Sequence, residues 1–161
     1  MSAPRRHTQT SHSRQRGLAM VEFAISAPVL LLLLFATVEF ANFMIEYSML
    51  SDAVRNATRY VAGAALAGDS GVLQQGGPWN TLVSQGQNLA VYGNVGGAGT
   101  ALLPALAVSQ ITITGDPTSN NISTTATYPY QSLFGGAIPD FMGGSIATNF
   151  TLTISTTMRA L

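Results

Sequence analysis

Residues 17–38 decide the fold of this chain, and they read GLAMVEFAISAPVLLLLLFATV. Glu22 is the one charged residue in this stretch. As a helix, the residues from Leu18 to Val38 would be about 31 Å long at roughly 1.5 Å per residue, which matches a hydrocarbon core of about 30 Å. The sequence therefore predicts a transmembrane helix over residues 18–38 that crosses the membrane once.

The charges on either side of this stretch predict its orientation. Four of the seven positive residues precede it, namely Arg5, Arg6, Arg14 and Arg16, whereas the residues after it carry both signs in near balance. Positive loops remain in the cytoplasm. We therefore expect a membrane protein with a cytoplasmic leader over residues 1–17 and a carboxyl-terminal part that faces the periplasm or the outside.

A secretory signal peptide would share the basic start and the apolar middle. After the leucine run, however, residues 35–47 read FATVEFANFMIEY, which lacks a pair of small residues at a cleavage position and continues a helical pattern. The Arg5-Arg6 pair is followed by polar residues instead of the apolar ones of a twin-arginine signal. A retained anchor is the better interpretation.

The composition offers little for catalysis. The chain has no Cys and no Lys, and both histidines, His7 and His12, lie in the leader. The remaining candidates for an acid, a base or a nucleophile are scattered carboxylates and hydroxyls. We expect no enzyme activity, no metal site, no cofactor, no small-molecule substrate and no nucleic-acid partner.

The helix is expected to continue outward over residues 39–67. Apolar residues recur there at spacings of three and four, the period of an amphipathic helix. These residues are Phe40, Phe43, Met44, Tyr47, Leu50, Val54, Ala57 and Val61. We expect this stripe to pack against a sheet of the same chain, and a bare coiled coil is the alternative.

Residues 68–161 are predicted to form a head with one short helix and about three strands. Glycines at 68 and 71 end the long helix, and a shorter helix follows around Trp79 to Ala90. Alternating patterns over residues 108–114 and 122–128, separated by a breaker-rich turn, predict an antiparallel hairpin. A third strand is expected over residues 145–158. The fold class is α+β, with the long helix extended into a periplasmic domain that has a small antiparallel sheet.

Two residues of the apolar stretch, a glutamate and a proline, are unusual in a membrane helix. Glu22 lies at its cytoplasmic edge, where burial in lipid would cost about 2.5–3.5 kcal/mol, unless the carboxylate lies among the head groups. Pro28 removes a backbone hydrogen bond and is expected to kink the membrane helix.

Residues 14–23, RQRGLAMVEF, resemble the processing site of type IV pilin-like precursors. The resemblance implies that a prepilin peptidase cuts after Gly17, leaving Leu18 as the new amino terminus. Glycine suits a scissile bond that must lie extended, and we expect it to interrupt the helix ahead of Leu18. Glu22 lies one turn after Leu18 on the same face. The resemblance implies that Glu22, followed by Phe23, meets the amino terminus of an adjacent subunit during assembly.

The stretch from Gly17 to Ala67 is similar to the TadE-like family of minor pseudopilins. The similarity lies in the Glu-Phe pair, the proline before the leucine run, a second glutamate at the outer end, and the segment Thr58-Arg59-Tyr60. It implies a subunit of the tight-adherence (Flp-type) pilus, with other pilins, pseudopilins and the assembly platform as partners, and a part in cell adhesion and biofilm formation. TadF-like proteins share this helix, and the choice between the two families stays open.

Two other functions remain as alternatives. The chain could be an unprocessed single-span anchor whose periplasmic domain binds a partner or a surface glycan. A membrane-tethered hydrolase would need Asp69, Asp116 or Asp140 beside a serine or threonine, but the exported part has no Gly-x-Ser-x-Gly elbow and no Ser/His/Asp set.

Overall fold

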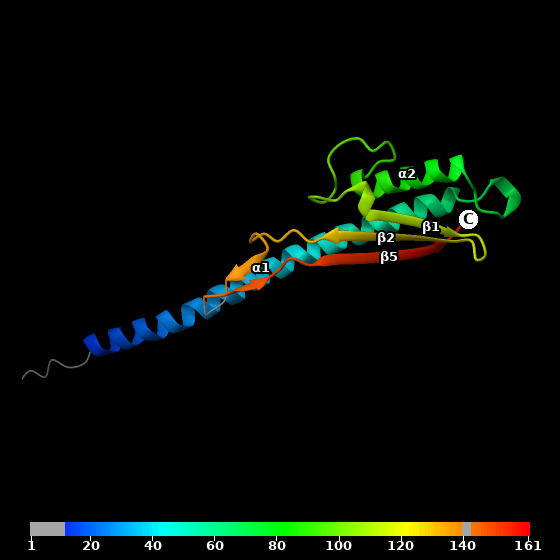
Figure 1. The fold of residues 1–161 in the computed structure, drawn as a ribbon. Coiled ribbons are helices and arrows are strands. Elements are labelled where there is room, and N and C mark those ends of the chain that lie inside the picture. The colour runs from blue at the N-terminus through cyan, green and yellow to red at the C-terminus, as the bar shows by residue number, and fades with distance from the viewer. Residues whose placement is uncertain (1–11, 140–142) are drawn as a thin grey trace, which may run out of the picture.

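The computed structural model describes residues 12–139 and 143–161 of the chain. One long helix, α1, runs the length of the molecule, and a small head gathers along its carboxyl-terminal half (Figure 1). The elements in chain order are α1 (His12–Ala64), a 3₁₀ turn (Gly68–Ser70), α2 (Gly77–Tyr92), a second 3₁₀ turn (Val108–Gln110), β1 (Ile111–Asp116), β2 (Asn121–Pro129), β3 (Ala137–Pro139), β4 (Ser145–Ala147) and β5 (Thr151–Arg159). The predicted α+β class is confirmed.

Helix α1 begins earlier than the sequence predicted. It starts at His12 and runs through Gly17, so the expected interruption ahead of Leu18 is wrong for the full-length chain. A single glycine costs a helix only about 1 kcal/mol relative to alanine, and Gln15, Arg16 and Leu18 around it are good helix formers. The rest of the predicted leader, residues 1–11, lies outside the described residues.

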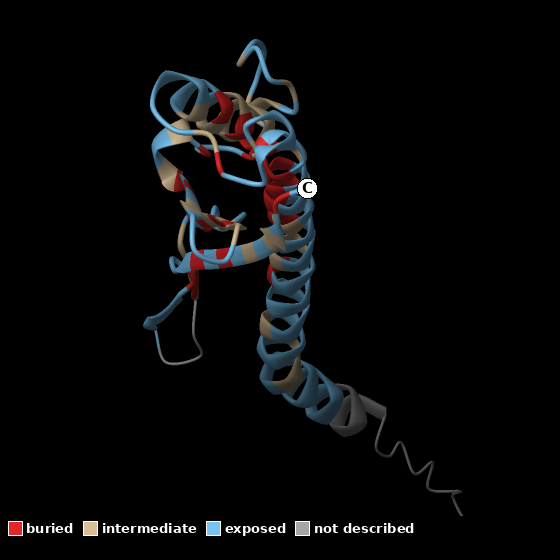
Figure 2. Cartoon of the chain, turned by 90° about the vertical axis from the view of Figure 1, so that its right-hand side faces the viewer, coloured by how far each residue is buried: buried red, intermediate tan, exposed pale blue. Residues whose placement is uncertain are grey.

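Helix α1 also continues through Pro28 without ending. Figure 2 shows its axis bending within the amino-terminal part, although the kink at Pro28 itself stays a prediction. At the other end α1 stops at Ala64, slightly before the expected residue 67. The chain end caps this turn, because the backbone N–H of Leu161 donates to the carbonyl of Ala62 over 3.0 Å.

The predicted hairpin is present. Strands β1 and β2 pair antiparallel, β2 pairs antiparallel with β5, and the sheet order is β1-β2-β5. Along β2 the side chains of Ile122, Thr124, Ala126 and Tyr128 are buried, and the intervening ones face outward. On the outer face hydroxyl groups bond across the strands, as Ser123 does with Thr157 at 2.7 Å.

The predicted third strand, residues 145–158, is wrong as a single element. Its first part, β4, pairs with β3 in a separate two-stranded sheet, and only β5 joins the main sheet. The change of partner occurs at residues 148–150, where the N–H of Thr148 donates to Gly136 and the carbonyl of Phe150 accepts from Tyr130. Apolar residues continue at even spacing across this junction, so the alternation in the sequence hides the break.

The core lies between α1, α2 and the three-stranded sheet. The outer part of the expected stripe, from Leu50 through Val54 to Val61, is buried there, and Figure 2 shows the buried residues concentrated in the half of α1 beside the head. The inner part of the stripe follows the prediction only at Phe43, which is half-buried against the core, whereas Phe40 is 62 % and Met44 47 % exposed. At that level the face of the helix that the head covers carries polar residues beside Phe43.

Candidate functional site

The predicted processing site lies on the free amino-terminal part of α1. Gly17 is exposed, its φ is not positive, and a Cβ placed on it would meet no atom within 4 Å. The folded chain thus gives no conformational or packing reason for glycine at this position. Gly86 differs, because a Cβ there would lie 2.5 Å from Cγ2 of Val61.

Leu18, Glu22 and Phe23 follow Gly17 within two helical turns. Leu18 is 71 % and Phe23 67 % exposed, and Glu22 is exposed as well. Within the part of the chain that the structure describes, Glu22 forms no hydrogen bond or ion pair. The structure brings these residues together on one helix, and it leaves them away from the head.

The surrounding helix has the properties of a membrane anchor. Its most apolar 18-residue window has a mean hydropathy of 2.4, and none of that window is buried by the rest of the protein. Leucines 30, 31, 33 and 34 are all at least half exposed. Such a surface is suited to lipid and not to water.

A second group of residues, at the junction between helix and head, was not predicted. Glu39, Asn42 and Glu46 recur at spacings of three and four on one face of α1, and both glutamates are buried, at 6 % and 7 % exposure. Oε2 of Glu39 accepts from the N–H of Leu133 at 3.2 Å, and Oε2 of Glu46 accepts from the N–H of Gln131 at 3.5 Å. These carboxylates fasten the chain after β2 to the helix. We call this group the junction cluster.

Tyr130 completes the junction cluster. Its hydroxyl donates to the backbone carbonyl of Glu39 at 3.2 Å and accepts from Nδ2 of Asn42 at 3.1 Å. Its ring stacks on Phe150 at 4.9 Å and meets Phe43 edge-on at 5.9 Å. Burial, as the largest cause, raises the pKa of Tyr130, so the phenol stays a neutral donor at physiological pH. The feature of the sequence that could have indicated the junction cluster is the seven-residue spacing of Glu39 and Glu46, which places both on one face of the helix.

An open hollow of about 300 Å³ lies beside the junction cluster. It is lined by Ala36, Glu39, Phe40, Phe43, Tyr130, Ile138, Thr148 and Phe150. Oε1 of Glu39 and Oγ1 of Thr148 are buried without a hydrogen-bond partner among the described residues. The lining is otherwise apolar, so the hollow suits a hydrophobic group better than a polar ligand.

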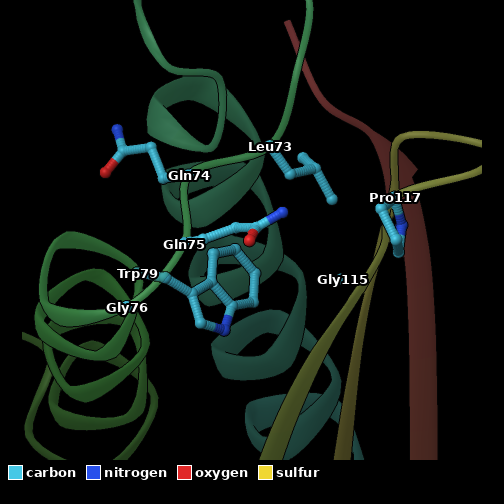
Figure 3. Close-up of a pocket in the computed structure, with 7 residues that line it drawn as sticks. All are labelled: Leu73, Gln74, Gln75, Gly76, Trp79, Gly115 and Pro117. Carbon is cyan, nitrogen blue, oxygen red and sulfur yellow. The ribbon is translucent and has the colours of Figure 1, made fainter.

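A second hollow, of about 240 Å³, lies at the opposite end of the head. Figure 3 shows the indole of Trp79 lying between Gln75 and the strand that carries Gly115. The amide of Gln74 is engaged, because Nε2 donates to the carbonyls of Ala64 and Leu66. None of the residues that line this hollow is an acid or a base. Across residues 12–139 and 143–161 no three metal-ligating side chains come together.

Comparison with known proteins gives one match. Residues 17–59 match the family of TadE-like proteins, which confirms the predicted resemblance for this part of the chain. The matched region includes Gly17, Leu18, Glu22 and Phe23 of the predicted processing site and the helical half of the junction cluster, and it ends before the head. No curated protein and no solved structure matches the chain significantly.

Proposed function

We propose that this chain, TadE-like over residues 17–59 and related to the Tad pilus, is a minor pseudopilin of a tight-adherence (Flp-type) system that a prepilin peptidase cuts after Gly17. The protein is anchored to a membrane by α1. In the proposed arrangement that membrane is the bacterial inner membrane, with the leader in the cytoplasm and the head in the periplasm. The role is structural and not catalytic.

One observation supports the cleavage more than any other. Gly17 lies within a helix, and no neighbouring atom in the folded chain requires a residue without a side chain there. A glycine in an exposed helix costs about 1 kcal/mol relative to alanine. A requirement imposed by another protein would explain it, and a peptidase that must hold the backbone extended in its cleft imposes such a requirement.

Glu22 supports the proposed assembly step. Cleavage would place a new ammonium on Leu18, one helical turn from this carboxylate. A lone carboxylate at the edge of the lipid is costly, and a neighbouring positive group reduces that cost. The proposed partner is the amino terminus of an adjacent subunit, and the other partners are further pilins and pseudopilins and the assembly platform. Adhesion and biofilm formation would follow at the level of the whole pilus.

The cleavage is tested by mass spectrometry of the protein from cells that contain the pilus system. We expect Leu18 at the amino terminus and residues 1–17 missing. Gly17→Leu should leave the precursor intact. Gly63→Leu is the matched control, because Gly63 is also an exposed glycine of α1 and a Cβ placed on it would meet no atom within 4 Å. This control should be processed normally.

The assembly role of Glu22 is tested separately. Glu22→Gln keeps the size of the side chain and removes its charge, so processing should persist while incorporation into the pilus machinery falls. Glu22→Asp keeps the charge and should retain most of the incorporation into the pilus machinery. An intact Met1 terminus in the wild-type protein would instead support the unprocessed anchor, and normal assembly of Glu22→Gln would remove the proposed role of the carboxylate.

A further inference from the structure

The segment between β2 and β5 lies beside the outer end of the apolar stretch of α1. We call its described residues, 131–139 and 143–150, the membrane-proximal segment. The ring of Phe134 lies 5.2 Å from the ring of Phe35, and the ring of Phe150 lies 5.5 Å from that of Phe43. Figure 1 shows β3 and β4, in orange, extending past the three-stranded sheet toward the amino-terminal half of α1.

The position of Phe35 gives the depth of this contact. Phe35 lies three residues inside Val38, the end of the predicted span, which is about 4.5 Å along a helix axis. If α1 crosses the membrane over residues 18–38, Phe35 lies in the outer edge of the hydrocarbon. Phe134 packs against it and therefore lies at the same level, where head groups give way to acyl chains.

The surface of the segment suits that environment. Leu133 is 59 %, Phe134 38 %, Ile146 52 % and Phe150 46 % exposed. Asp140 is the one charged residue in the sequence between β2 and β5 and lies outside the described residues, and none of the residues 131–139 and 143–150 is charged. Side chains of this kind enter the boundary between head groups and acyl chains when they lie beside it.

Backbone groups of the segment also form hydrogen bonds within the protein. Ile138 of β3 pairs with Ile146 of β4, and the N–H of Leu133 is bonded to Oε2 of Glu39. Backbone groups that are already paired lower the cost of entering a less polar environment. The same bond to Glu39 holds the segment at a fixed height along α1.

We propose that the membrane-proximal segment inserts its exposed apolar side chains into the outer boundary of the lipid bilayer, as a second membrane contact beside α1. The occupant of this surface is lipid, because the surface is continuous with the helix that enters the membrane. Two contacts would fix the tilt and the rotation of the head above the bilayer, which one helix does not. The inference rests on membrane anchoring by α1 and not on pilus assembly.

Tryptophan fluorescence in vesicles tests this contact with the full chain. The native Trp79, the single tryptophan, is first changed to Phe, and a reporter is introduced by Phe134→Trp or, in a second variant, by Ile146→Trp. The vesicles consist of phosphatidylcholine with bromine on the upper or on the lower acyl carbons. Both reporters should emit at short wavelength and be quenched, more strongly by the upper bromines.

The matched control is Val72→Trp in the same background. Val72 is 54 % exposed in the loop between α1 and α2. The next residue, Leu73, lines the hollow at the opposite end of the head from the membrane-proximal segment, so the reporter at Val72 should stay unquenched. Quenching of the first two reporters should not change when the protein is diluted in lipid. The proposal is overturned if both stay unquenched, or if their blue shift disappears on dilution, which would show that a second copy covers the surface. Processing at Gly17 would be unaffected by either result.

Discussion

The phenolic hydroxyl of Tyr130 donates a hydrogen bond of 3.2 Å to the backbone carbonyl of Glu39, although the two residues are 91 positions apart in the sequence. This bond joins the end of β2 to α1 immediately outside the apolar stretch. Because Asn42 donates to the same hydroxyl at 3.1 Å, the phenol is both donor and acceptor in the junction cluster.

Removal of that hydroxyl should loosen the junction. Tyr130→Phe keeps the ring contacts with Phe43 and Phe150 but loses both hydrogen bonds, and we expect a loss of about 1–2 kcal/mol in the free energy of unfolding. Chemical denaturation of the full chain in detergent micelles measures this. Tyr47→Phe is the control, since the hydroxyl of Tyr47 forms no hydrogen bond within the described residues and the residue is 43 % exposed. Equal effects of the two changes would contradict the role of the junction cluster.

The contact between the two helices depends on Gly86. A Cβ at this position would lie 2.5 Å from Cγ2 of Val61 and 2.9 Å from Cδ1 of Ile113. Gly86→Ala should therefore destabilise the head by about 1–3 kcal/mol, despite the better helix propensity of alanine. Gly63→Ala, where α1 leaves open space, should instead gain about 0.5–1 kcal/mol. The same denaturation measurement applies, and a stabilising Gly86→Ala would disprove the close packing.

The sequence predicted the elements that depend on short-range periodicity. The apolar run, its outward continuation and the hairpin of β1 and β2 each carry their signal within a few residues, and each was located to within a few positions. The core stripe was correct from Leu50 onward for the same reason. Local patterns cannot tell how far the head extends along the helix, so the exposure of Phe40 and Met44 was missed.

The junction cluster and the division of the last strand depend on contacts between distant residues. No local pattern in the sequence marks Glu39 and Glu46 as buried, and only their partners at residues 130–133 show that they are. Likewise β4 differs from β5 in its partner and not in its alternation. The helix through Gly17 was missed because one weak residue cannot stop a helix whose neighbours all favour it.

The stability that the turn between β1 and β2 contributes to the fold should decrease at acidic pH. The hydroxyl of Ser119, the larger cause, and the N–H of Thr118 donate to Asp116 at 2.6 and 2.8 Å and lower the pKa of its carboxyl below the usual 3.8. A carboxyl whose pKa is lower in the folded than in the unfolded chain stabilises the fold at pH values above its unfolded pKa. This stabilisation is lost as the pH falls through its folded pKa. The denaturation midpoint of the wild type should therefore exceed that of Asp116→Asn at neutral pH. The difference should shrink below about pH 4, and a constant difference would contradict the assignment.

The indole of Trp79 reports on the far end of the head. It covers Gly115, where a Cβ would lie 2.9 Å from Cη2 of the ring and 3.1 Å from Cδ1 of Leu73. Gly115→Ala should push the ring toward water, shift its emission to longer wavelength, increase its quenching by acrylamide, and cost about 1–3 kcal/mol. Gly77→Ala is the control, because it lies two residues from Trp79 but meets no atom within 4 Å, so its emission should match the wild type. An unchanged spectrum in Gly115→Ala would mean that the indole does not need the space that this glycine leaves.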